Sequence, residues 1–129
     1  MARQRRLFSA VFKVEPAITP QNFQTGARMK VMIDLCVIPI GVGVSVSEYV
    51  TACQRVLEEA GLEHQLHAYG TNIEGDWDEV MAAVKRCHEV VHEMGASRIS
   101  SSMRLGTRID REQSIQDKIQ SVTDKLAAD

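Results

Sequence analysis

The fold is decided by the stretch His67-Ala68-Tyr69-Gly70-Thr71-Asn72-Ile73-Glu74-Gly75-Asp76-Trp77-Asp78-Glu79-Val80. An alternating segment ends at Tyr69, the pair Gly70-Thr71 can reverse the chain, and a second short segment runs to Glu74. This pattern predicts a β-hairpin with a two-residue Gly70-Thr71 loop. Such a loop pairs Tyr69 with Asn72 and His67 with Glu74.

A helix is predicted directly after the hairpin. Gly75 breaks the alternation, and Asp76 is placed as a helix N-cap with Glu79 three residues later, as in a capping box. The predicted helix runs from Trp77 to about Met94. A hairpin that leads directly into a helix indicates the middle of a β-α-β-β-α-β arrangement.

The segments before the hairpin agree with this arrangement. Residues 29–38 are apolar on both faces, which predicts a central strand with Asp34 on the face away from the helices. A loop of residues 39–43 follows. Ser45 with Glu48 has the capping-box pattern and opens a predicted helix that ends at Ala60.

The segments after residue 94 complete the β-α-β-β-α-β arrangement. Residues 98–109 alternate and predict a long strand. A last helix is expected from near Arg111, with a narrow apolar seam formed by Ile115, Ile119, Val122 and Leu126. The fold class is therefore α+β, a ferredoxin-like βαββαβ sandwich with an extra C-terminal helix and with the first and third strands in the centre.

The overall composition excludes several classes of protein. A chain of 129 residues that is 44% apolar and 25% charged has the composition of one globular domain. A net charge of −2 gives no reason to expect nucleic acid or a membrane surface as partner. Cys36, Cys53 and Cys87 form no CxxC pair, so reduced thiols in the cytoplasm are expected.

Residues 1–28 differ from the remainder of the chain. They are rich in arginine and poor in acids, and four apolar residues could share one helical face (Leu7, Phe8, Val11 and Phe12). This composition is typical of a mitochondrial presequence, which would place the protein in mitochondria. The alternatives are a disordered tail and an over-extended start before Met29. We treat residues 1–28 as a flexible leader and residues 29–129 as the domain.

Two helices on one side leave the other face of the predicted sheet open. The residues expected there are Asp34, Gln65, His67, Tyr69, Asn72, Glu74, Ser100, Ser102 and Arg104. Carboxylates, an aromatic ring, amides and hydroxyls suit a small cationic or polar ligand. Alternatively, Asp34 and Arg104 pair across adjacent strands inside an oligomer interface. Exposed apolar residues on this face, such as Met32 and Cys36, also predict self-association.

Catalytic and metal-binding patterns are weaker. His88-Glu89-Val90-Val91-His92 matches the H-E-x-x-H pattern of metalloproteases, but a zinc site needs a third protein ligand. His64 and His67 lie on a predicted strand edge with no route to that pair. No nucleophile or phosphate-loop motif is present. We therefore expect no catalytic residues and no metal.

Three motifs resemble the small YkoF-like thiamine-binding family. They are Asp34–Gly41 (DLCVIPIG), Gly70–Val80 (GTNIEGDWDEV) and Arg104–Arg111 (RLGTRIDR), and the resemblance covers about residues 29–127. It implies a ferredoxin-like fold, dimers or tetramers formed through the sheets, and binding of thiamine or its pyrimidine portion without catalysis.

Thiamine suits the predicted open face because its thiazolium is cationic and its aminopyrimidine is flat and hydrogen-bonding. We assign Glu74 or Asp34 to the charge or the amino group, and Tyr69 to stacking. Thr71, Asn72 and Ser102 are assigned to ring hydrogen bonds, and Arg104 completes the site. Trp77 is interpreted as core packing rather than as a ligand contact.

The predicted function is non-enzymatic binding of thiamine or a related hydroxymethylpyrimidine, as carrier, buffer or sensor, with thiamine as a bound ligand rather than a cofactor. The alternative is a structural or regulatory homo-oligomer with no small-molecule ligand.

Overall fold

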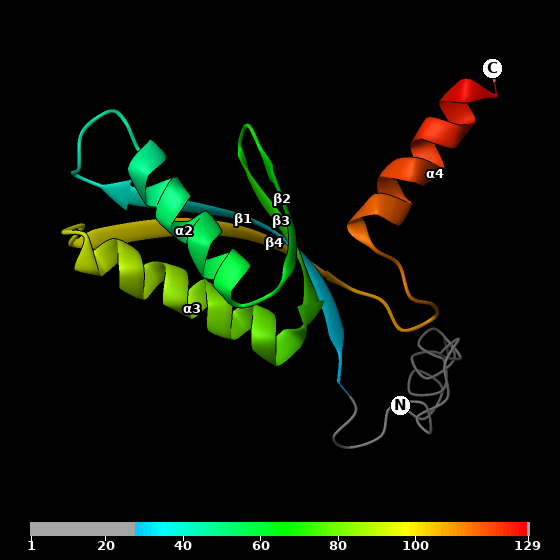
Figure 1. The fold of residues 1–129 in the computed structure, drawn as a ribbon, viewed down its shortest axis with the longest axis horizontal. Coiled ribbons are helices and arrows are strands. Elements are labelled where there is room, and N and C mark those ends of the chain that lie inside the picture. Colours follow the sequence, from blue (N-terminus) through cyan, green and yellow to red (C-terminus); the bar gives the residue numbers. More distant parts are fainter. Residues whose placement is uncertain (1–27, 129) are drawn as a thin grey trace, which may run out of the picture.

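A computed structural model describes residues 28–128. Within that range the elements are β1 (Lys30–Ile40), α2 (Ser47–Glu59), β2 (Glu63–His67), β3 (Gly70–Asp76), α3 (Trp77–Glu93), β4 (Arg98–Thr107) and α4 (Ile115–Ala127). The strands form one antiparallel sheet in the order β2-β3-β1-β4, with α2 and α3 on one face (Figure 1). The ferredoxin-like arrangement with β1 and β3 in the centre is confirmed. The leader prediction concerns residues 1–28, and all of these except Arg28 lie outside the described residues.

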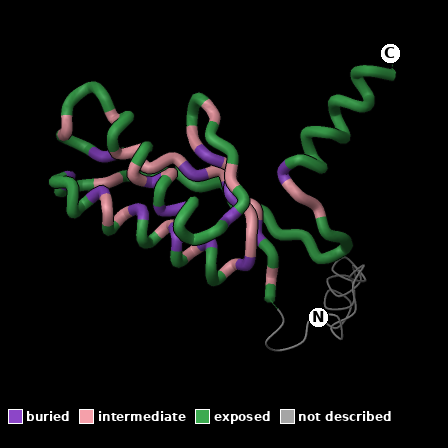
Figure 2. Tube along the Cα trace, viewed as in Figure 1, coloured by how far each residue is buried: buried purple, intermediate pink, exposed green. Residues whose placement is uncertain are grey.

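The core lies between the sheet and the two helices. Ile33 of β1 and Ile73 of β3 are cross-strand partners, and their exposed fractions are 1% and 0%. Burying an isoleucine side chain contributes about 1.5–3 kcal/mol. Buried positions alternate with half-exposed ones along both strands, as Figure 2 shows. Trp77 packs against this core, which confirms its structural interpretation.

The hairpin turn differs from the prediction. His67 pairs with Gly70 and Leu66 with Thr71, so the turn is Ala68-Tyr69 and not Gly70-Thr71. Gly70 belongs to β3, where a Cβ at its position would lie only 2.7 Å from the carbonyl oxygen of Leu35. The glycine is therefore required for the close approach of β3 to β1, and not for the turn.

The first strand of the hairpin ends two residues earlier than predicted, and the second strand begins two residues earlier than predicted. Because side chains alternate along a strand, a shift of two residues keeps every side chain on its face. Asn72 and Glu74 therefore remain on the open face, as predicted. Tyr69 leaves the sheet face and lies in the turn, where 89% of its surface is exposed. Thr71 is buried on the helix side, and Gln54 Nε2 of α2 donates a 2.9 Å hydrogen bond to its hydroxyl.

The helix starts also differ in their capping. α2 begins at Ser47 with Val46 as N-cap and without a side-chain cap, so the Ser45 capping box is wrong. Asp76 is the N-cap residue of α3, but its carboxylate makes no cap hydrogen bond. It instead pairs with Lys30 Nζ at 3.0 Å and with Arg28 Nη1 at 3.1 Å. These two cations hold the pKa of the Asp76 carboxyl below its ordinary value, the Lys30 contact being the larger cause.

α4 begins at Ile115 rather than near Arg111. Its N-terminus has a capping box, the motif that was predicted at the starts of α2 and α3. Ser114 Oγ accepts from Asp117 N–H, and the Asp117 carboxylate accepts from Ser114 N–H. Ile115 is buried, whereas Ile119, Val122 and Leu126 are 45%, 58% and 72% exposed. After its first turns the helix projects away from the sheet (Figure 1).

The close approach at Gly70 gives a direct test of the hairpin register. Gly70→Ala places a methyl group against the Leu35 carbonyl, so we expect the free energy of unfolding to fall by about 1–3 kcal/mol in urea denaturation. Gly106→Ala on β4 is the matched control, because a Cβ there meets nothing within 4 Å. A change within about 0.5 kcal/mol is expected for the control. Equal effects of the two substitutions would contradict the register.

Candidate functional site

The sheet register places most of the predicted site residues together on the open face. Asp34 of β1 lies between its cross-strand partners Asn72 of β3 and Arg104 of β4. Met32 pairs with Glu74 on one side of Asp34, and Cys36 pairs with Ser102 on the other. Because side chains two residues apart on a strand share a face, these polar groups point to the same side of the sheet.

Asp34 is the centre of a hydrogen-bonded group. Its Oδ1 accepts from His67 Nε2 at 2.6 Å and from Asn72 Nδ2 at 3.4 Å. The Asp34 side chain is 44% exposed and that of His67 is 35% exposed, so the carboxylate is held in place and still meets solvent. Arg104 makes no ion pair within residues 28–128. The side chains of Asp34 and Arg104 therefore form no ion pair among the described residues, although the two residues are cross-strand partners.

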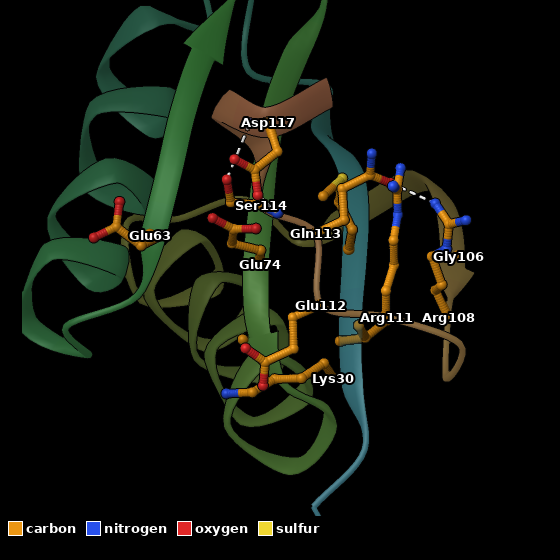
Figure 3. A pocket seen from close by; sticks show the side chains of 13 residues that line it. Lys30, Glu63, Glu74, Gly106, Arg108, Arg111, Glu112, Gln113, Ser114 and Asp117 are labelled. Atoms are coloured by element: carbon orange, nitrogen blue, oxygen red, sulfur yellow. Dashed lines mark hydrogen bonds between the residues drawn. The ribbon is translucent and has the colours of Figure 1, made fainter. Parts of the chain in front are cut away.

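Glu74 contacts the start of α4. Its Oε2 accepts a 3.0 Å hydrogen bond from the backbone N–H of Ile115. Burial raises the pKa of the Glu74 carboxyl above its ordinary value; the Ile115 hydrogen bond opposes this, and the charges of Glu63 and Asp117 add to it. Figure 3 shows the three carboxylates around the same hollow.

Two adjoining hollows lie between the open face and the segment that carries α4. One, of about 450 Å³, contains Glu74 and is the hollow drawn in Figure 3. The other, of about 620 Å³, contains Asp34, Asn72 and Arg104, and α4 contributes Ile115, Lys118 and Ile119 to its wall. The two share Met32, Gly106 and Gln113 in their linings. Together they form a surface with polar groups from the sheet and with apolar side chains from both the sheet and α4, as small-molecule sites have.

Tyr69 and Thr71 are separated from this surface. Both line a third hollow, of about 210 Å³, on the helix side of the sheet beside α2. The assigned roles of Tyr69 in stacking and of Thr71 in ring hydrogen bonding on the open face are therefore inconsistent with their positions. The two roles depended on the wrong hairpin loop.

His67 was expected on the open face but was not among the predicted ligand-binding residues, and Lys118 was predicted in neither group. The alternation of residues 63–69 placed His67 on the open face, but no pattern in the sequence indicated its contact with Asp34. Lys118 reaches the hollow only because α4 starts beside Glu74. That contact joins positions 41 residues apart and has no local signal.

The H-E-x-x-H histidines are both used in the fold. His88 Nε2 lies 2.7 Å from Ser101 Oγ, and His92 Nδ1 lies 2.7 Å from the carbonyl oxygen of Ala96. Their ring centroids are 6.4 Å apart. In residues 28–128 no group of three or more histidine, cysteine, aspartate or glutamate side chains is arranged to hold a metal ion.

Residues 33–123 match the family model described as thiamine-binding protein. The chain belongs to the thiamine-binding protein family. It is 63% identical over 105 residues to the UPF0045 protein sll0230 of Synechocystis, which covers 81% of this chain and 87% of that relative. It is 43% identical over 102 residues to the UPF0045 protein ECM15 of Eremothecium gossypii, with 78% and 97% covered. Membership in this family supports a small-molecule binding role.

Solved structures of similar proteins have the same fold. The protein MJ1052 of Methanocaldococcus jannaschii aligns with a TM-score of 0.69 at 35% identity, over 74% of this chain and 97% of that one. A Thermotoga maritima protein, named as a candidate thiamine biosynthesis or salvage protein, aligns with a TM-score of 0.63 over 72% of this chain and 98% of its own. The identity in that case is 18%, so the likeness shows the shared fold alone. Among residues 28–128, no helix has both the length and the apolar character needed to cross a bilayer.

The raised pKa of Glu74 predicts a specific pH dependence of stability. Between the unfolded pKa and the higher folded pKa, the folded protein binds more protons than the unfolded chain. The free energy of unfolding therefore falls as the pH rises through that interval. Glu74→Gln keeps an oxygen that accepts from Ile115 N–H but does not titrate. In urea denaturations from about pH 3.5 to about pH 8, we expect the free energy of unfolding of this variant to lack the fall that Glu74 causes in the parent protein.

Asp76 is a useful comparison, because its pKa is shifted in the opposite direction to that of Glu74. Its pKa is lowered in the folded protein, so its contribution to stability is lost as the pH falls. Asp76→Asn should remove that acid-side loss and leave the Glu74 interval unchanged. A Glu74→Gln profile parallel to that of the parent over the whole range would contradict the assigned shift.

Proposed function

We propose that this chain binds thiamine or a related hydroxymethylpyrimidine on the open face of its sheet, without transforming it, as a carrier, buffer or sensor. The observation that carries the proposal is the Asp34 carboxylate. It lies at the floor of the 620 Å³ hollow, is held by His67 and Asn72, and is 44% exposed to solvent. A fixed and accessible carboxylate beside apolar side chains is what a flat organic cation requires.

The two hollows differ in a way that suits the two rings of thiamine. Asp34 is assigned to the cationic thiazolium, because its charge faces solvent in the larger hollow. Glu74 is assigned to the aminopyrimidine, because a carboxyl group accepts a hydrogen bond from an amino group and, when protonated, donates one to a ring nitrogen. The raised pKa of Glu74 favours the protonated form. Asn72 and Ser102 supply further hydrogen-bonding groups on the same face, with Asn72 directly in the lining of the larger hollow.

A second candidate function is a structural or regulatory homo-oligomer with no small-molecule ligand. The exposed seam of α4 favours it, since Ile119, Val122 and Leu126 are 45%, 58% and 72% exposed. Apolar residues exposed in a row on one helix face are typical of a surface that meets a partner. Self-association through this seam would not by itself exclude a ligand, so the two candidates differ in whether the hollow at the base of the helix is occupied.

The ligand hypothesis is tested by Asp34→Asn, which keeps the shape of the side chain and removes its charge. Loss of a charged partner costs about 1.5–3 kcal/mol, so we expect thiamine to bind about 10- to 100-fold more weakly in isothermal titration calorimetry. Asp78→Asn is the matched control, since it makes the same change in net charge on the exposed first turn of α3. Equal affinity of the parent and Asp34→Asn proteins would reject the assigned site, and no binding of thiamine or hydroxymethylpyrimidine to the parent would reject the function.

The oligomer hypothesis is tested by Val122→Glu, which places a charge in the middle of the α4 seam. If the seam is an interface, we expect a lower assembly mass in sedimentation velocity, because a charge buried without a partner is strongly unfavourable. Ser121→Glu adds the same charge beside the seam and should leave the mass unchanged. An assembly that keeps its mass in both variants would exclude the seam as the interface.

A further inference from the structure

We propose that the hollow below α4 recognises an anionic tail on its ligand, so that the physiological ligand is a phosphate ester of thiamine and not free thiamine. This inference rests on the function proposed above and specifies the substrate class of the same site. It begins from the balance of charges around the 620 Å³ hollow. The lining contains one carboxylate, from Asp34, and two cationic side chains, from Arg104 and Lys118.

The single carboxylate does not neutralise the two cations. Asp34 is already engaged by His67 and Asn72. Neither Arg104 nor Lys118 makes a side-chain hydrogen bond or an ion pair within residues 28–128, and both side chains are exposed. A ligand whose only charge is a cation would be attracted by Asp34 but would leave Arg104 and Lys118 without an anionic partner.

The adjoining 450 Å³ hollow has the opposite balance. It is lined by four carboxylates, from Glu63, Glu74, Glu112 and Asp117, and by three cations, from Lys30, Arg108 and Arg111. Two of these cations are already paired, Lys30 with Asp76 and Arg108 with Asp110. The open face is therefore acidic near Glu74 and basic near Arg104, with Asp34 between them in the register.

A phosphate ester of thiamine has its groups in the matching order. The aminopyrimidine is at one end, the thiazolium cation is in the middle, and the ester on the hydroxyethyl group is at the other end. Placed with the aminopyrimidine near Glu74 and the thiazolium near Asp34, the molecule directs its phosphate toward Arg104 and Lys118. Arginine binds phosphate through two parallel N–H donors, and lysine binds it as a compact point charge.

The experiment compares thiamine with thiamine monophosphate by isothermal titration calorimetry at low ionic strength, on the full chain. We expect the ester to bind at least about tenfold more tightly than thiamine, because charge-assisted hydrogen bonds to phosphate are gained. Added salt should reduce this advantage, since exposed charges are screened. In Arg104→Ala and in Lys118→Ala the ratio of the two dissociation constants should fall toward one.

Matched controls lie on the same two elements. Arg98→Ala at the start of β4 and Lys125→Ala in the last turn of α4 remove the same charges outside the hollow, and they should leave the ratio unchanged. A fall in the ratio in these controls would overturn the proposal, because it would assign the effect to net charge.

The remaining outcomes are also decisive. If thiamine binds and the ester binds no more tightly, the anion inference fails while the proposed function stands. If neither compound binds, both fail. Inorganic phosphate that binds as tightly as the ester would overturn the inference by separating the anion site from thiamine. A lower assembly mass for Arg104→Ala would also overturn it, by assigning the arginine to a subunit interface.

Discussion

The open face depends on the burial of one cross-strand pair, Ile33 of β1 and Ile73 of β3, which are 1% and 0% exposed. Because side chains alternate along a strand, an inward Ile33 forces Asp34 outward, and an inward Ile73 forces Asn72 and Glu74 outward. A slip of one residue would place two carboxylates under the helices, where an unpaired charge is very unfavourable. The same hydrophobic contact that stabilises the domain thus selects the side on which its polar groups lie.

The second constraint is the contact between Glu74 and α4. The Glu74 carboxylate accepts from the N–H of Ile115 at the start of the helix, where backbone donors lack partners and negative charge is favourable. The Ser114–Asp117 capping box fixes the same turn. This anchored turn contributes Lys118 to the hollow over Asp34. The remainder of α4 has no comparable anchor on the sheet, which explains the exposure of its apolar seam.

Much of this fold could be predicted from the sequence because its signals are local. The order of the elements follows from changes between two-residue and helical periodicity, and the faces of Asp34 and Glu74 follow from alternation. The position of the turn did not follow, because Gly70 is required by its distance from Leu35 on another strand. Capping was misassigned at Asp76 for the same reason, since its carboxylate pairs with Lys30 from β1. In both cases a contact distant in sequence displaced a local pattern.

The partners of the charged residues in the site also depend on contacts that are distant in sequence. Asp34 and Arg104 are cross-strand partners, and in isolation such a pair is expected to attract. The hairpin instead brings His67 to 2.6 Å from Asp34 Oδ1, so the carboxylate is engaged by a residue from β2. Arg104 is then left without a carboxylate partner among the described residues, and it lines the same hollow as Lys118 from α4. Two cations in one hollow without anionic partners do not stabilise the fold, whereas they would attract an anionic ligand.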